Sequence, residues 1–176
     1  MQKDKDCKDS IKERRSIRRF KETPLGTEII DELLSLAQMA PSAGNLQSRD
    51  FVVVTDKTTK KKLAEAALDQ SFIEQAPVVI VFVANIERAS RKYGSRGELY
   101  AIQDATASVM TLLIAAQSIG ISSCWVGAFD DFAVSKILLI PYEAKPVAIV
   151  PLGLADESPS PPPRMELSKI VHKETW

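Results

Sequence analysis

Four arginines and a serine lie within six residues near the N-terminus of this chain, in the sequence RRSIRR at residues 14–19. A guanidinium presents a fork of N–H donors that suits a phosphate, and a serine hydroxyl adds a small donor beside it. The same sequence also suits a surface turn at the end of a helix, where positive charge offsets the helix dipole. The cluster alone therefore leaves two interpretations open, an anion-binding site and a structural turn.

Two further segments combine polar or small residues in a way that suits a ligand. The loop at residues 41–47 (PSAGNLQ) contains three side chains with both donor and acceptor atoms, Ser42, Asn45 and Gln47. At residues 125–130 (WVGAFD) an apolar run ends in Gly127 and Ala128, which would allow a flat ligand to lie against the backbone. An ordinary loop and a plain turn at a strand end are the alternatives.

Composition excludes several classes of function. The 176 residues include 23 Lys and Arg against 23 Asp and Glu, and this zero net charge argues against a nucleic-acid-binding protein. His172 is the only histidine and lies close to the C-terminus, so we expect no Ser-His-Asp triad and no metal site. The glycines form neither a GxGxxG nor a Walker A motif. If the protein is an enzyme, a bound cofactor is expected to supply its chemistry.

Nothing in the sequence indicates export or a membrane. Cys7 and Cys124 lie in very different contexts and do not resemble a disulfide framework. Residues 1–10 are too polar for a signal peptide, and the most apolar window, residues 105–116, is about three helical turns long. We therefore expect a cytoplasmic protein with no membrane partner.

The elements expected around these segments alternate between helix and strand, which indicates a layered α/β domain. Residues 16–20 are expected to be extended, with Ser16 and Arg18 on one side. The polar segment at residues 85–98 is expected to be a mobile loop. We expect helices at residues 7–15, 27–39, 56–68, 99–119 and 130–139, and strands at residues 51–55, 78–84, 121–126 and 145–152.

Four segments of the sequence indicate which surfaces are buried and which are exposed to solvent. Residues 105–116 are apolar or small almost all the way round a helix, so we expect burial on every side, in part by a partner subunit. The proline-rich run at residues 158–163 is expected to be an extended connector. The apolar residues beyond it should dock, namely Leu167, Ile170, Val171 and Trp176. The lysines of the helix at residues 56–68 are expected to form a solvated face.

Taken in order along the chain, these motifs resemble the FMN-dependent nitroreductase family. The resemblance rests on RRSIRRF, APSAGNLQS, QAPVVIVF, ELYAIQDATASVMTLLIAAQSIGISSCWVGAF and PPPRMELSKIVH, which span nearly the whole chain. It implies an α+β fold, a three-layer α/β/α sandwich whose central mixed sheet is flanked by helices, in an intertwined homodimer with FMN at the interface. Residues 1–176 would then form one FMN-binding domain, with residues 158–176 an extended tail that docks on the dimer.

The resemblance also implies roles for the arginines and for Ser16, at the phosphate of FMN and beside its ring. Arg14 and Arg164 match arginines that contact the phosphate, and Ser16 matches a nearby polar contact. Arg18 matches a basic residue close to flavin N1 and O2, and Arg15 fills a neighbouring contact position. Positive charge near N1 would stabilise the negative charge that reduction leaves there.

A second set of residues is implied at the flavin ring. The loop that approaches the ring from the partner subunit is matched by Ser42, Asn45 and Gln47. Gln70 matches, in a looser alignment, a contact to the pyrimidine edge. Gly127 and Ala128 match the backbone that covers the flavin and donates to N5.

The activity implied is transfer of hydride from NAD(P)H, through flavin N5, to a nitroaromatic, quinone or flavin acceptor by a ping-pong mechanism. The chain supplies no dedicated catalytic acid or base. Two alternatives remain: a different flavin reaction on the same fold, such as reductive dehalogenation or flavin cleavage, and a non-catalytic flavin-binding module. The chain is shorter than the larger family members at residues 85–98, which leaves the acceptor more open than the cofactor.

Overall fold

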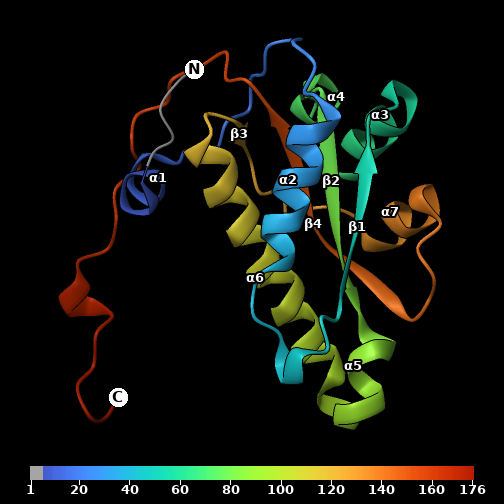
Figure 1. The fold of residues 1–176 in the computed structure, drawn as a ribbon, viewed down its shortest axis with the longest axis vertical. Helices are drawn as coiled ribbons and strands as arrows, with labels where there is room; N and C mark the ends of the chain where they lie inside the picture. Colours follow the sequence, from blue (N-terminus) through green and yellow to red (C-terminus); the bar gives the residue numbers. More distant parts are fainter. Residues whose placement is uncertain (1–5) are drawn as a thin grey trace.

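The computed structural model describes residues 6–176 as a three-layer α+β structure built on a four-stranded sheet (Figure 1). The strands follow the order β1-β2-β4-β3, with β1 at Arg49–Val54, β2 at Val78–Asn85, β4 at Ala144–Gly153 and the short β3 at Ser122–Ser123. Residues 1–5, half of the polar N-terminal stretch considered above, lie outside the described part of the chain. The expected layering of helix, sheet and helix is confirmed.

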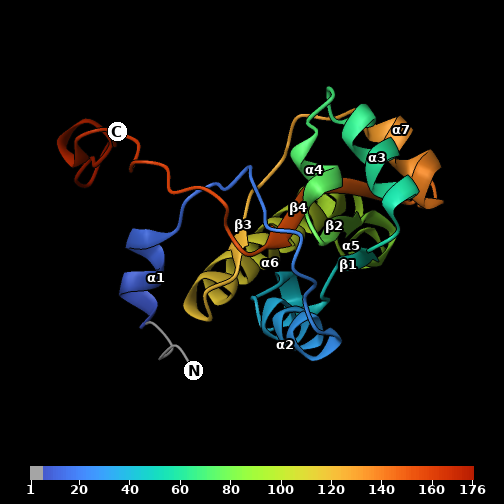
Figure 2. The same cartoon turned by 90° about the horizontal axis from the view of Figure 1, so that it is seen from above.

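Helices cover both faces of the sheet (Figure 2). One face packs against α2 (Thr27–Gln38) and α6 (Gly97–Ser118), and the other against α3 (Lys57–Ala66), α4 (Phe72–Gln75) and α7 (Asp131–Leu138). Successive side chains of β2 alternate between the two cores, Val79, Val81 and Val83 in one and Val78, Ile80 and Phe82 in the other. Burial on both faces explains why β2 is an unbroken apolar run in the sequence.

The sheet is antiparallel, which corrects the expected mixed sheet. All three strand pairs run antiparallel, and parallel pairing among residues 6–176 is limited to one bridge between Ser16 and Ser123. Residues 16–21 follow the edge of the sheet from β3 towards the end of β4, where Phe20 pairs with Ala155 in the antiparallel sense. Because β3 has only two residues, this edge offers too short a ladder for a parallel strand.

The segment at residues 85–98 is helical, so the expectation of a mobile loop is wrong. It forms α5 (Ile86–Tyr93) and the short turn η2 (Gly94–Arg96). The Asn85 side chain caps α5 by accepting a hydrogen bond from the Arg88 backbone N–H at 3.0 Å. A Cβ added at Gly97 would lie 2.5 Å from the Cα of Ser90, which shows how closely α5 approaches α6. The polar sequence belongs to a helix with one narrow buried side.

Helix α6 is buried on one side and open on the other in the single chain. Its buried residues include Val109, Leu112 and Leu113, whereas Met110 is 37% exposed and Ile114 is half-buried. The stretch at residues 86–118 is long and apolar enough to cross a membrane by composition, yet α6 packs against α2 and β2. It is a core helix, and the expected burial on every side does not occur within one chain.

The C-terminal tail leaves the body of the molecule after β4 and runs down one side at a distance from it (Figure 1). It contains only the short turn η3 (Leu167–Lys169). The four apolar residues expected to dock are exposed, at 72% for Leu167, 55% for Ile170, 54% for Val171 and 100% for Trp176. The expected docking of these residues does not occur within one chain.

One lysine of α3 does not belong to the expected solvated face. Lys57, Lys61 and Lys62 are exposed, but Lys60 is buried and its Nζ donates to the carbonyl oxygens of Ala76 at 2.5 Å and Pro77 at 3.5 Å. Burial lowers the pKa of the Lys60 amine. The Lys60 amine satisfies the carbonyl groups of the two residues that connect α4 to β2.

We expect Lys60→Met to lower the free energy of unfolding by about 1–3 kcal/mol, because two carbonyl oxygens would lose their buried donor. Lys61→Met is the matched control, since this exposed neighbour lies on the same helix and should change stability by no more than about 0.5 kcal/mol. Urea unfolding of both variants measures the difference. Equal effects would contradict the structural role of Lys60.

Candidate functional site

The arginine cluster and the proline-rich tail meet to form a polar pocket of about 490 Å³. Every charged residue in its lining is an arginine, and these come from both ends of the chain. The lining residues are Arg14, Arg15, Ser16, Arg18, Pro159, Ser160, Pro162 and Arg164. Convergent guanidinium groups beside a hydroxyl make this pocket suited to an anion with several oxygen atoms, such as a phosphate.

The pocket exists because the segment after α1 (Cys7–Glu13) is hydrogen-bonded to the edge of the sheet. Ile17 is buried and its backbone N–H donates to Ser123 O at 3.0 Å, which turns Ser16 and Arg18 towards the pocket as the alternation predicted. The Glu157 carboxylate accepts from the backbone N–H groups of Arg18 and Arg19. The first residues of the tail are therefore fixed against residues 14–19, which we call the arginine segment.

The arginines at and near the pocket make different contacts. Arg15 Nη1 donates to the carbonyl oxygens of Lys12 at 2.7 Å and Arg14 at 2.9 Å, so the helix-end interpretation applies to this residue. Arg19 forms an ion pair with Asp156 at 3.2 Å and does not line the pocket. The side chains of Arg14, Arg18 and Arg164 line the pocket without such a role at the helix end.

The buried thiol of Cys124 lies near the charged groups of the pocket. Burial raises the pKa of Cys124, while the positive charges of Arg18 and Arg14 and a hydrogen bond with Ser16 act in the opposite direction. These three groups all line the pocket. The Glu157 carboxylate adds to the effect of burial on this pKa, so the thiol lies between the arginines of the pocket and the acid that holds the tail.

A second group of expected site residues, Gln70 and Ala128, lies near α4, the helix whose Phe72 ring Arg18 contacts. The Arg18 guanidinium carbon is 6.0 Å from the centre of the Phe72 ring in α4, an element that the sequence analysis did not anticipate. Close by in the sequence, Gln70 Nε2 donates to Ala128 O at 3.2 Å and to Ala67 O at 2.8 Å. Gln70 and Ala128, which the sequence offered as separate candidates, are thus in direct contact, and Gly127 and Ala128 are exposed.

The loop with Ser42, Asn45 and Gln47 is not brought to this pocket within one chain. It contains the short turn η1 (Ala43–Asn45) and is held by Asp104 in the N-terminal half of α6, whereas the arginine segment pairs with residue 123, beyond the C-terminal end of that helix. Fourteen residues of helix separate Asp104 from Ser118, which corresponds to about 21 Å. Figure 1 shows η1 beside the other end of α6 from the arginine segment.

Sequence reasoning missed the polar residues that hold this loop. Asp104 and Arg49 are both buried at 4% exposure, and Arg88 donates to the backbone oxygen of Gln47 at 2.6 Å. The signal for Asp104 was a single carboxylate inside an otherwise apolar helical run. It went unused because a lone acid on a helix is usually solvated.

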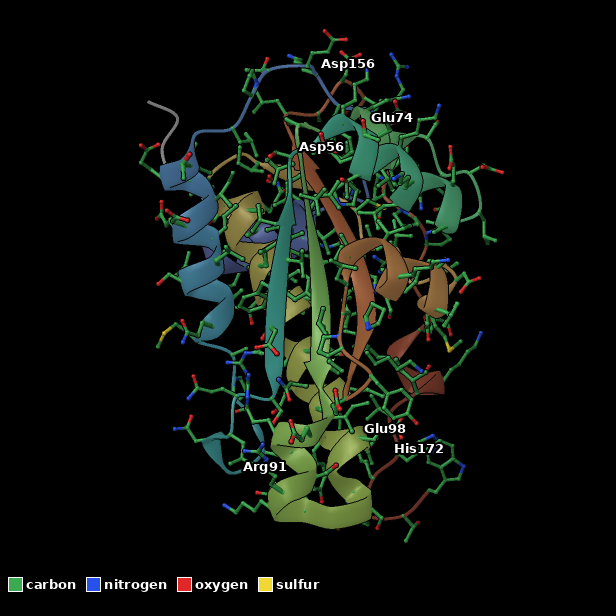
Figure 3. All side chains as sticks on the ribbon, turned by 90° about the vertical axis from the view of Figure 1, so that its right-hand side faces the viewer. Asp56, Glu74, Arg91, Glu98, Asp156 and His172 are labelled. Carbon is green, nitrogen blue, oxygen red and sulfur yellow. The ribbon has the colours of Figure 1, made fainter. Side chains whose placement is uncertain are left out.

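Two larger hollows lie elsewhere, beside α7, with volumes of about 620 and 640 Å³. Phe132 and Tyr142 line both hollows. Glu98 and other acids line the first, which does not suit a phosphate, and the second is mostly apolar with Lys136 as its one charged residue. Figure 3 shows Glu98 at one end of the sheet and Asp156, which pairs with the arginine segment, at the other. None of the expected site residues lines these hollows.

Comparison with known proteins matches the geometry. The Nitroreductase family model matches residues 11–71 and 67–154, which leaves Arg164 and the tail outside the matched region. An NADH dehydrogenase of Thermus thermophilus is 34% identical over 94% of this chain and 95% of that protein. An FMN reductase (NAD(P)H) of Bacillus subtilis is 29% identical over 95% of this chain and 73% of its own length.

The fold is also shared with solved structures. The NADPH:FMN oxidoreductase of Vibrio harveyi, solved in complex with NAD⁺, superposes with a TM-score of 0.90 at 25% identity and covers 97% of this chain and 77% of its own. The family model covers most of the chain, and the Thermus relative matches it nearly end to end. From this agreement of sequence and architecture it follows that the chain belongs to the nitroreductase family.

Proposed function

We propose that this protein is an NAD(P)H-dependent flavin oxidoreductase that uses FMN. The observation that carries the proposal is the arginine pocket, in which Arg14, Ser16 and Arg164 provide donors for a phosphate dianion. Relatives named FMN reductase, and the NADPH:FMN oxidoreductase that shares this fold, support FMN as the cofactor. Close relatives named NADH dehydrogenase support NADH or NADPH as the reductant.

The residues that line the arginine pocket fit FMN. With the phosphate between Arg14 and Arg164, the flavin would extend past Arg18 towards Gln70 and Ala128. This placement rests on two contacts, that of Arg18 with the Phe72 ring of α4 and that of Gln70 with Ala128. When bound, FMN accepts hydride from NAD(P)H and passes the electrons to a nitroaromatic, quinone or flavin acceptor in a second half-reaction. The protein binds and orients the cofactor, and the guanidinium of Arg18 adds a fixed positive charge that needs no proton transfer.

A homodimer completes the site in this proposal. One chain holds the arginine pocket and the polar loop at opposite ends of α6, and the side of α6 near Met110 and Ile114 is open. A second copy on this side would bring Ser42, Asn45 and Gln47 of one subunit to the FMN held by the other. The tail at residues 158–176 would dock on the partner, in an interface of more than about 2,000 Å².

An absorbance spectrum and an anaerobic titration test the function. We expect the purified protein to sediment as a dimer, to carry FMN and to lose its flavin absorbance on addition of NADH or NADPH. FMN that neither nucleotide reduces would favour a non-catalytic flavin-binding module. Rapid reduction without turnover of nitroaromatics, quinones or free flavin would favour a different flavin reaction, and a protein that binds no FMN would contradict the proposal.

The phosphate contact is tested with Arg164→Ala. Loss of a charge-assisted hydrogen bond worth about 1.5–3 kcal/mol should weaken FMN binding by about tenfold to a hundredfold, whereas riboflavin, which lacks the phosphate, should lose little affinity. Arg19→Ala is the matched control, because Arg19 pairs with Asp156 and does not line the pocket. Fluorescence titration with both flavins measures the effect, and equal weakening of FMN and riboflavin would show that Arg164 acts through the tail.

The position of Arg18 is tested through the reduction potential. A guanidinium beside the ring stabilises negative charge there, so Arg18→Gln should lower the potential of bound FMN by roughly 30 mV for each 1.4 kcal/mol of stabilisation lost. Arg19→Gln, the adjacent arginine, should leave the potential unchanged. A redox titration decides, and an unchanged potential with weakened FMN binding in Arg18→Gln would place Arg18 at the phosphate.

A further inference from the structure

We propose that Asp104 is a positioning residue that fixes the shape of the loop at residues 42–48, so that its side chains meet the flavin of a second subunit. The inference rests on the proposed function, because it is there that this loop is assigned to the cofactor. It goes beyond that function by naming the group within the core that holds the loop in place.

Both oxygens of the Asp104 carboxylate are used by the loop. Oδ1 accepts a hydrogen bond from the backbone N–H of Ala43 at 2.9 Å, and Oδ2 accepts one from that of Ser48 at 3.1 Å. The side chain is 4% exposed and projects from α6, the longest helix described. One carboxylate on a rigid element therefore holds both ends of the loop at once.

The backbone of the loop takes only part of its shape from local preference, since glycine and asparagine adopt left-handed φ angles readily and glutamine does not. Gly44, Asn45 and Gln47 have φ angles of 56°, 57° and 52°, in the left-handed region that non-glycine residues rarely adopt. Two further bonds support this shape, from Gln47 N–H to Ser42 Oγ at 3.0 Å and from Arg88 Nη1 to Gln47 O at 2.6 Å. A backbone with this strain persists only where its surroundings determine it.

Helix α5 covers the loop on another side. A Cβ added at Gly44 would lie 2.4 Å from Tyr93 Oη and 2.8 Å from Lys92 Nζ, both at the end of α5. Only glycine fits this position without a shift of those side chains. Asn45, the next residue, is exposed, so the loop is fixed through its backbone and still presents a polar side chain outwards.

The buried carboxylate of Asp104 is compensated by the loop amides and by the positive charge of the nearby Arg49. A buried carboxylate is unfavourable unless it is paired and hydrogen-bonded, and an apolar side chain would suit the core of α6 better. The hydrogen bonds that the carboxylate accepts come from loop amides. The nearby buried Arg49 holds the preceding residues, since its Nη2 donates to Gln38 O at 2.5 Å and Ala40 O at 2.9 Å.

The first experiment compares Asp104→Asn with Ser108→Ala. The amide retains the size of the side chain but offers one acceptor oxygen in place of two, so one of the N–H groups of Ala43 and Ser48 loses its partner. We expect faster hydrogen exchange at these two amides and FMN binding weakened by about tenfold or more. Ser108, one turn further along α6, is equally buried and bonds only within the helix, to Asp104 O at 3.2 Å, so Ser108→Ala should retain wild-type affinity.

A second variant covers the case in which Asp104→Asn is poorly folded. Gly44→Ala disturbs the same loop from the side of α5 and leaves α6 untouched. It should weaken FMN binding in the same way, while the strain at this positive φ lowers the midpoint of thermal unfolding by only about 2–4 °C. Wild-type FMN affinity in a folded Gly44→Ala protein would overturn the inference.

The decisive test uses mixed dimers in which one subunit bears Asp104→Asn and the other bears Arg14→Ala, purified with two different affinity tags. If the loop serves the partner's flavin, each mixed dimer has one site with an intact pocket and an intact loop. FMN titration should then show half of the sites at wild-type affinity, although neither homodimer has any. Mixed dimers with no site of wild-type affinity would show that Asp104 acts only within its own subunit, and would overturn the inference.

The wild-type protein separates this inference from the function on which it rests. If wild-type protein binds no FMN, the proposed function fails and the inference fails with it. If wild-type protein binds FMN and is reduced by NAD(P)H, but Asp104→Asn binds FMN equally well while Ala43 and Ser48 exchange faster, the function stands and the positioning role is wrong.

Discussion

The backbone hydrogen bonds between residues 16–21 and the far edge of the sheet bring the two parts of the arginine pocket together. Ile17 N–H donates to Ser123 O at 3.0 Å and Lys21 N–H to Leu154 O at 2.9 Å, so an N-terminal segment lies along the end of the last strand. Arg14 and Arg164, 150 residues apart, come to line one pocket as a result. A chain with no net charge thereby concentrates positive charge at one place.

Helix α6 sets the distance between the arginine pocket and the polar loop at residues 42–48. At its C-terminal end the chain continues into the edge that binds the arginine segment, and in its N-terminal half Asp104 holds the polar loop. A straight helix keeps these two regions apart within one chain, so in the proposed dimer they belong to two different sites. The open side around Met110 is where a second copy would supply the missing part.

The sequence predicted those features that depend on local pattern and missed those that depend on tertiary contacts. The buried strand β2 and helix α6 were found because their apolar runs are long, and the arginine cluster because it is dense. Helix α5 was missed because its stability comes from the Asn85 cap and from close packing on α6, which a polar sequence conceals. Lys60 and Asp104 were missed because charges are normally solvated, and only the fold places carbonyl or amide groups around them.

The proline-rich connector explains how the tail can serve both the pocket and a second molecule. Proline fixes φ, so residues 158–163 lose little conformational entropy when Arg164 is held at the pocket. An extended proline-rich chain advances about 3 Å per residue, so these six residues span roughly 18 Å and take the tail beyond the surface of its own subunit. The apolar side chains beyond the connector are exposed in the single chain, as the proposed docking of the tail on a partner requires; they are Leu167, Ile170, Val171 and Trp176. In the proposed dimer, the same rigid connector would place Arg164 in the pocket and direct the tail towards the partner.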